Sequence, residues 1–232
     1  MRLKLKTRFR VILREWGKPL LIVLLIGVTL RSAVADWNDV PTGSMKPTIL
    51  EGDRIFVNKL AYGLRLPLTA WWLTRWSEPQ RGDVVIFFSP EDGARLVKRV
   101  VGLPGDVVVM RRNLLIINGQ PADYGPLDEE IVNQIAVDKQ SHHQFAAEKL
   151  DDQAHPVMAT PALPAMRSFG PTTVPEGHYY VLGDNRDVSG DSRFIGTIPA
   201  EQIVGRSSRV ILSLDPESPF TPRWDRILRT LP

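Results

Sequence analysis

The hydrophobic positions divide the chain into one continuous apolar run near the N-terminus and a longer part with short apolar segments. The continuous run covers residues 19–30 without a charged residue. Beyond it, short apolar segments alternate with glycine, proline, asparagine and aspartate, which favours antiparallel β structure over a parallel α/β sheet. We therefore expect a mainly β protein that follows one N-terminal helical segment.

Two dipeptides predict tight turns between strands. Asp92-Gly93 separates the apolar residues 83–89 from residues 95–102, which is a strong signal for a β-hairpin. Asn118-Gly119 predicts another turn. Further strands are expected at residues 107–110, 114–117, 178–183 and 203–213.

Residues 121–173 are polar and rich in proline, and we interpret them as an inserted subdomain. Within them, residues 128–136 could form one or two helical turns. The basic C-terminal segment, residues 222–232, is expected to be a solvated tail. The predicted organisation is a basic head (1–18), an anchor (19–37), a main β domain (38–120 and 174–232) and the insert (121–173).

The charge is distributed unevenly along the chain. Residues 1–35 contain eight lysines and arginines against Glu15 alone, so this part carries +7 and the remainder −4, within a net charge of +3. A basic head before an apolar run predicts that the head stays in the cytoplasm and that the remainder is translocated. Nucleic-acid binding is a poor explanation for the basic charge.

The N-terminal segment alone leaves an anchor and a cleaved signal peptide both open. Its continuous run has 12 residues, whereas a membrane span needs about 20 residues. Ala33-Val34-Ala35 also resembles a signal cleavage site. The anchor interpretation requires the segment from Pro19 to Trp37 to cross, with Arg31 extending to the outer interface and Trp37 at the level of the headgroups.

Cysteine is absent, which excludes a disulfide framework, a thiolate zinc site and a cysteine nucleophile. Residues 41–48 (PTGSMKPT) offer a different nucleophile, because two prolines and Gly43 can hold Ser44 in a fixed pose. Taken alone, such a segment is also typical of an ordinary loop.

Lys98 is a candidate general base. Strand alternation places it on the same face as Leu96 and Val100, so it should lose hydration and its pKa should fall. A neutral amine near pH 7 can accept a proton. The alternative is a lysine on an edge strand that reaches water.

Residues 183–193 (GDNRDVSGDSR) are too densely charged for an ordinary connection. Calcium binding is the first alternative, but neither Asp184 nor Asp187 begins the spacing of an EF-hand loop. We expect a hydrogen-bonded wall of an active site.

Together these segments resemble the bacterial type I signal peptidases (leader peptidases), which are serine peptidases with a Ser-Lys dyad. The resemblance covers most of the chain outside the insert, and five such motifs in order are specific. The segments that carry it are PTGSMKPT, EGDRIFVNK, RGDVVIF, LVKRVVGLPGD and GDNRDVSGDSRFIG, with a C-terminal VGR.

The resemblance implies a role for each matching residue. Ser44 matches the nucleophile and Lys98 the base, and Thr42 matches the hydroxyl that completes the oxyanion hole with the Ser44 backbone N–H. Ser189 matches the serine that orients the lysine. Supporting residues that hold or shape the loop would be Asp184, Asn185, Arg186, Asp187, Asp191 and Arg193. Leu96 departs from the family, which often has tyrosine there, so detailed subsite preference stays open.

The resemblance also implies an antiparallel β catalytic domain with a smaller inserted β domain. It implies a retained single-pass anchor in the bacterial plasma membrane, with the N-terminus in the cytoplasm and the catalytic domain on the outer side. The expected partners are membrane lipid and exported preproteins, which would be cut after Ala-x-Ala, and no nucleic acid. No cofactor and no metal are expected.

Several alternatives stay open. One is a specialised processing peptidase of the same chemistry, and another is a secreted, non-enzymatic β-rich binding module with a cleaved signal. A cytosolic self-cleaving repressor shares the chemistry, but it would need a DNA-binding domain that nothing here supports. A histidine triad is the enzyme alternative, although His142, His143 and His155 lie in the insert and His178 precedes a strand.

Three tryptophans, Trp71, Trp72 and Trp76, lie in the apolar stretch LPLTAWWLTRW. They could pack in the core or contact the bilayer, where aromatic side chains are enriched at the interface. We expect membrane contact.

Overall fold

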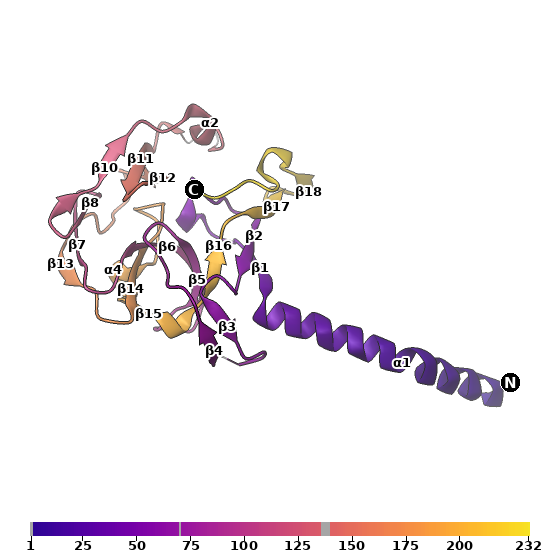
Figure 1. Ribbon diagram of the computed structural model, residues 1–232. Helices are drawn as coiled ribbons and strands as arrows, with labels where there is room; N and C mark the ends of the chain where they lie inside the picture. Colours follow the sequence, from indigo (N-terminus) through magenta and orange to yellow (C-terminus); the bar gives the residue numbers. More distant parts are fainter. Residues whose placement is uncertain (1, 70, 136–139) are drawn as a thin grey trace.

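The structure is a computed structural model that describes residues 2–69, 71–135 and 140–232. Helix α1 (Arg2–Ala33) projects from a β-rich body (Figure 1). Its segment Trp16–Ala33 is long and apolar enough to cross a membrane. The predicted anchor extended to Trp37, but the helix ends at Ala33 and the following residues form strand β1 (Ala35–Asp39). They leave the helix because they pair with β2 (Asp53–Asn58).

The main sheet is antiparallel and has the order β15-β14-β6-β5-β16-β2-β17-β18, with β1 paired to β2. Its central hairpin joins β5 to β6 through the predicted Asp92-Gly93 turn and places Val85 opposite Lys98. The predicted strand at 203–213 is two strands, β16 and β17. The bounds are β5 (Val84–Phe88), β6 (Arg95–Gly102), β14 (His178–Leu182), β15 (Ile198–Pro199), β16 (Ile203–Ser207), β17 (Val210–Asp215) and β18 (Ser218–Pro222).

Among the described residues there are also three smaller sheets. The first has the order β13-β7-β8-β9, the second β10-β11-β12, and the third is the hairpin β3-β4. Their bounds are β3 (Gly63–Arg65), β4 (Trp72–Arg75), β7 (Val107–Arg111), β8 (Leu114–Ile117), β9 (Gln120–Pro121), β10 (Asp123–Gly125), β11 (Gln144–Leu150), β12 (Gln153–Ala159) and β13 (Phe169–Thr173). Short helices are η1 (Gly43–Met45), α2 (Glu129–Val132), α4 (Ser192–Ile195), η2 (Ala200–Gln202) and η3 (Trp224–Arg226).

The mainly β, antiparallel architecture is confirmed. The sheet β10-β11-β12 lies wholly within the predicted insert, whereas both ends of that range pair with strands outside it, β9 with β8 and β13 with β7. The insert boundaries therefore stay a prediction. The expected helical turns at 128–136 include α2, capped by the Asp128 side chain, while Ala136 lies outside the described residues.

The C-terminal segment is not a solvated tail, so that expectation was wrong. Arg226 is buried and pairs with Asp53 of β2, with Nη2 2.5 Å from Oδ2. Leu231 packs in the core cluster that also holds Met45 and Val97. A buried guanidinium requires a counter-charge, and here this comes from a strand about 170 residues away in the sequence.

Candidate active site

Ser44 lies in η1 and is held from two directions. The backbone N–H of Asn185 donates to the Ser44 carbonyl at 3.1 Å, and the Asn185 side-chain amide donates to the Gly43 carbonyl at 3.1 Å. The next residue, Met45, is buried in the core, and its carbonyl accepts from Ile49 N–H at 2.9 Å. The loop that carries Ser44 (residues 41–48, the nucleophile loop) is therefore fixed on one side by residues 183–193, the wall loop. On the other side it is fixed by apolar packing.

Gly183 begins the wall loop, and its lack of a side chain allows this close approach. A Cβ atom there would lie 2.5 Å from the Ser44 carbonyl oxygen and 2.6 Å from Ser189 Cβ, closer than real Cβ atoms come to other atoms. Any larger residue would push the wall loop away from the nucleophile loop.

Lys98 comes from β6 and reaches Ser44 directly. Its Nζ lies 2.7 Å from Ser44 Oγ and donates to the Val97 carbonyl at 3.0 Å. The residue is 3% exposed. Burial lowers the pKa of Lys98 to about 8, although the carboxylates of Asp191 and Asp184 oppose this shift. At pH 7 about a tenth of the amine is thus neutral, and this fraction rises to about half near pH 8, as a general base requires.

The acidic side chains of the wall loop are each paired with an arginine. Asp191 binds Arg193 through Nη2 at 2.7 Å and Nε at 2.8 Å, and it also accepts from Gly183 N–H at 3.0 Å. The other two pairs are Asp184 with Arg99 at 2.8 Å and Asp187 with Arg167 at 2.9 Å. In the part of the chain that the structure describes, no group of three or more acidic or histidine side chains is arranged to hold a metal ion.

Thr42 and Ser189 are placed less directly. Thr42 is exposed, two residues before Ser44, and its side chain does not cap η1, so the hydroxyl is not used for that purpose. The Ser189 hydroxyl is buried beside Gly183 and has no hydrogen-bond partner among the described residues, Lys98 included. The structure thus brings Ser44 and Lys98 into contact, while the expected orienting bond from Ser189 is not formed in this conformation.

The histidines do not form a triad with Ser44. His178 Nδ1 lies 3.0 Å from the Glu176 carbonyl, and His155 is buried with Nε2 3.3 Å from Glu148 Oε1. No hydrogen bond joins a histidine to Ser44 within residues 2–69, 71–135 and 140–232.

The sequence analysis missed the contribution of the insert to the wall. Glu148 of β11 is buried and accepts two hydrogen bonds from Arg186, at 2.5 and 2.7 Å, and a further one from the Tyr124 hydroxyl. Burial would raise the pKa of Glu148, but the charge of Arg186 holds it well below its usual range. The signal in the sequence was weak, because Glu148 lies beside Lys149 in the mixed polar and apolar segment QFAAEKL of β11.

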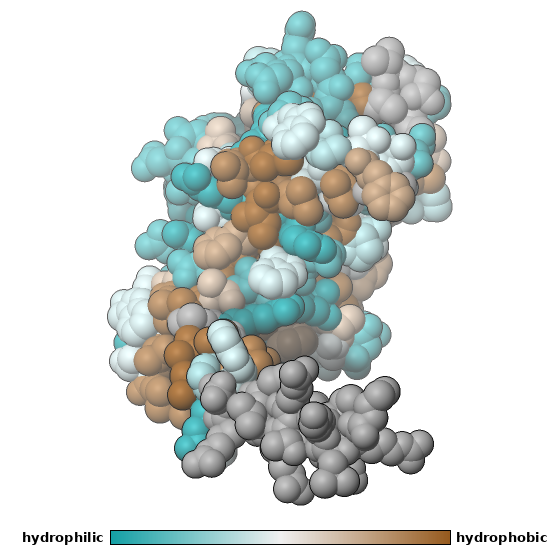
Figure 2. All heavy atoms as spheres, turned by 90° about the vertical axis from the view of Figure 1, so that its right-hand side faces the viewer, coloured by the Kyte–Doolittle hydropathy of each residue, from teal (hydrophilic) through white to brown (hydrophobic). Residues whose placement is uncertain are grey.

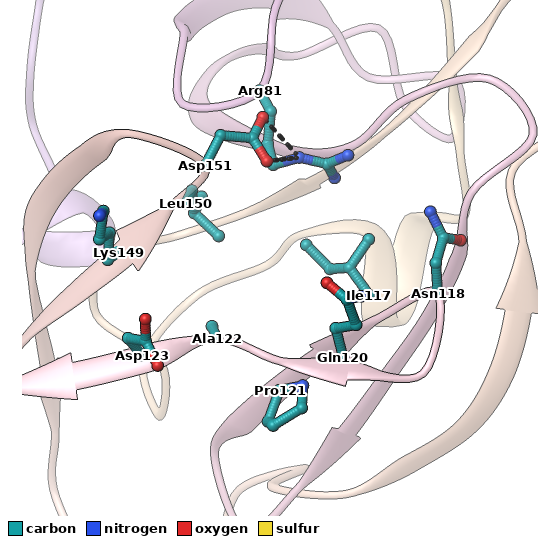
Figure 3. Close-up of a pocket in the computed structure, with 10 residues that line it drawn as sticks. All are labelled: Arg81, Ile117, Asn118, Gln120, Pro121, Ala122, Asp123, Lys149, Leu150 and Asp151. Carbon is teal, nitrogen blue, oxygen red and sulfur yellow. Dashed lines mark hydrogen bonds and ion pairs between the residues drawn. The ribbon is translucent and has the colours of Figure 1, made fainter.

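Insert residues line several cavities in the part of the chain that the structure describes. One of about 410 Å³ lies where Arg81 and Asp151 form an ion pair, and Ser44 and Lys98 are not among its lining residues (Figure 3). A second, of about 420 Å³, borders the nucleophile loop at Gly43 and the wall loop at Asn185.

Comparisons with known proteins give the family of this chain. A family model described as signal peptidase, peptidase S26, matches residues 13–212. The chain belongs to this family. A signal peptidase I of Pseudomonas fluorescens is 37% identical over 229 residues, which cover 93% of this chain and 78% of that relative. A signal peptidase I of Pseudomonas aeruginosa is 36% identical with the same coverage.

A solved structure of a signal peptidase I from Enterococcus faecalis is 35% identical and covers 56% of this chain and 97% of its own. The TM-score is only 0.34, so the fold described above stands on the strand pairings alone. Membership of the signal peptidase family gives the activity, which is removal of signal peptides by a serine peptidase. It also explains the candidate membrane helix Trp16–Ala33, because signal peptidases of this type are membrane-bound.

Proposed function

We propose that Ser44 is the nucleophile and Lys98 the general base with which this signal peptidase cuts exported preproteins after Ala-x-Ala. The observation that carries the proposal is the 2.7 Å contact between Ser44 Oγ and the buried amine of Lys98. The pKa of about 8 allows this amine to be neutral when it meets the serine.

The mechanism needs no group beyond the chain and water. Neutral Lys98 takes the Ser44 proton as Oγ attacks the scissile carbonyl, and the resulting ammonium gives that proton to the leaving amine. The Ser44 backbone N–H and the Thr42 hydroxyl donate to the oxyanion in this proposal. Lys98 then takes a proton from water as the water oxygen attacks the acyl carbonyl, and the ammonium returns that proton to Ser44 Oγ as the ester C–O bond breaks and the carboxyl product leaves.

The substrate would bind as an added strand. Residues 95–98 of β6 pair with β5, while β14 pairs only with the later part of β6, from Arg99 to Gly102. Among the described residues, β1 pairs with β2 alone. An extended peptide can lie between these two open edges, and alternate side chains would then face the same side, next to Met45 and Val97.

We propose a topology in which the basic head is cytoplasmic and the β body lies on the outer side of the membrane. The sequence Ala33-Val34-Ala35 should survive, because Ala33 is buried, Val34 accepts from Lys59 N–H at 3.0 Å and Ala35 pairs with Asn58. N-terminal sequencing of membrane-extracted protein is expected to begin at or near Met1, whereas a dominant start at Asp36 would contradict a retained anchor.

The β3-β4 hairpin is proposed to touch the bilayer. Trp71 is 76% exposed and Trp76 is also exposed, while Trp72 is partly buried against the core and lies beneath the guanidinium groups of Arg65 and Arg75. Figure 2 shows hydrophobic side chains low on this face, at the level that both α1 and the hairpin occupy in Figure 1. The tryptophans are therefore divided, with Trp72 in the core and the other two available to lipid.

Cleavage of a detergent-solubilised preprotein by wild-type, Ser44→Ala and Lys98→Ala proteins tests the proposal. Each substitution should lower the rate by roughly 10⁴-fold or more, and the double variant should lose little beyond that, because nucleophile and base act as one unit. Cleavage near the wild-type rate by either folded single variant would end the dyad proposal.

A further inference from the structure

Asp36 lies where α1 gives way to β1, and three cations surround its carboxylate. Arg31 Nε is 3.1 Å from Oδ1, and Lys59 Nζ and Arg95 Nη1 are 3.4 and 3.2 Å from Oδ2. The carboxylate is 8% exposed. The cations come from the end of α1, from the turn after β2 and from the start of β6. We call Asp36 and these three residues the junction cluster.

The junction cluster fixes the end of the helix to the body. Lys59 Nζ donates to the Arg31 carbonyl at 2.9 Å and to the Ser32 carbonyl at 3.2 Å, which are acceptors that the end of a helix leaves free. The Ser32 hydroxyl accepts from Leu68 N–H in the β3-β4 hairpin at 2.6 Å. The helix, β2 and the hairpin proposed to touch lipid are therefore connected at one point.

The same cluster joins the two edges proposed to hold the substrate. Asp36 belongs to β1, which leads to Ser44, and Arg95 begins β6, three residues before Lys98. Three residues of extended strand span about 10 Å. The contact between Asp36 and Arg95 thus joins the edges a short distance from the dyad, at the end nearest the helix.

We infer that the junction cluster fixes the distance between the membrane and Ser44, and so determines how many residues a preprotein must have between its apolar segment and its cleavage site. This inference rests on the roles proposed for Ser44 and Lys98. Signal peptides carry an apolar region followed by a small-residue cleavage site, so the intervening residues must reach from lipid to the dyad. Asp36 is a positioning residue in this scheme, since it acts through the helix, Lys59 and Arg95.

The test uses full-length enzyme in lipid vesicles and a series of preproteins in which this intervening segment is lengthened or shortened one residue at a time. Asp36→Asn keeps the size of the side chain and the acceptor for Trp37 N–H, which lies 2.9 Å from Oδ1, but removes the charge that holds three cations together. The matched control is Asp151→Asn, because the Asp151 side chain is 68% exposed, pairs only with Arg81 among the described residues and lies between β11 and β12, outside the two edges proposed to hold the substrate.

Wild-type and Asp151→Asn proteins should share one sharp optimum of spacing. In Asp36→Asn, the ratio of rates between the best spacing and a spacing four residues away should fall by about tenfold, because the dyad is no longer held at one height. Arg95→Gln is a second variant, which keeps the test decisive if Asp36→Asn does not fold. It removes the link between the edges while leaving Asp36 with Arg31 and Lys59, and it should also flatten the profile of cleavage rate against spacing.

A uniform loss at every spacing, or an unchanged optimum in both variants, would overturn the inference, because a merely structural role lowers all rates by one factor. The proposed function fails by a different result, namely cleavage of the preproteins by Ser44→Ala protein.

Discussion

Lys98 and Arg186 are buried to nearly the same degree, 3% and 2% exposed, yet their surroundings differ in one respect. Arg186 lies against the carboxylate of Glu148, so its charge is compensated. Lys98 contacts a hydroxyl and a carbonyl, so burial lowers its pKa to about 8. Burial alone therefore does not decide ionisation: the ordinary pKa of the group and its partner both matter, and a buried lysine amine whose direct partners are uncharged can serve as a base.

The largest expected effect comes from making Lys98 resemble Arg186. Lys98→Arg should lower the rate of preprotein cleavage by roughly 10⁴-fold, because a guanidinium stays charged and cannot accept the Ser44 proton. Lys149→Arg, at an exposed position on β11, should leave the rate unchanged. A Lys98→Arg protein that turns over within tenfold of wild type would show that a neutral amine is not needed.

The converse experiment removes the partner of Arg186. Glu148→Gln should lower the free energy of unfolding by about 3–5 kcal/mol, because it leaves a buried guanidinium without a counter-charge. Asp151→Asn is the control, since its exposed carboxylate pairs with Arg81 and should contribute about 1 kcal/mol or less. Denaturant unfolding of the solubilised protein measures the free energy of unfolding of both variants. Equal losses would show that the buried pair of Glu148 and Arg186 contributes no more than the exposed pair of Asp151 and Arg81.

Thr42→Val tests whether an uncharged hydroxyl also serves the reaction. The rate should fall by about 10²- to 10³-fold if the hydroxyl stabilises the oxyanion. Thr74→Val, exposed on β4, is a matched control that should keep the rate. A Thr42→Val protein that folds and cleaves normally would exclude Thr42 from the site.

The pH dependence of kcat/KM is the smallest expected effect, and it reports most directly on the ionisation of Lys98. Its pKa is lowered, so the neutral base is lost as the pH falls below about 8, and kcat/KM should then drop about tenfold per pH unit. Above that pKa the rate should level off. A profile that still rises steeply towards pH 10 would mean that Lys98 retains the pKa of a solvated lysine.

Local patterns in the sequence predicted much of the fold. The Asp92-Gly93 and Asn118-Gly119 turns and the strands beside them are confirmed, because their signals lie within a few residues. The Arg112-Asn113 turn between β7 and β8 was not foreseen, since neither residue is a glycine although both adopt positive φ, at 50° and 65°. The dyad contact agrees with the motifs that suggested it.

The missed features depend on partners distant in the sequence. Glu148 reaches Arg186 over 38 residues, and Arg226 reaches Asp53 over 173 residues. Composition marks such residues only as charged and therefore suggests exposure. Their burial follows from pairing, which a single sequence does not reveal.

The pairing of Ala35 with Asn58 has a consequence for the lifetime of the enzyme. In the proposed orientation, every copy of the enzyme carries Ala33-Val34-Ala35 near the membrane surface, where other copies in the same membrane could meet it. A substrate segment must be extended and unpaired to bind between the edges of β1 and β6. Ala33-Val34-Ala35 instead forms the end of a helix and the start of a strand. In the proposed topology, folding therefore withdraws this Ala-x-Ala sequence from other copies of the enzyme, and we expect autolysis mainly in copies that have not finished folding.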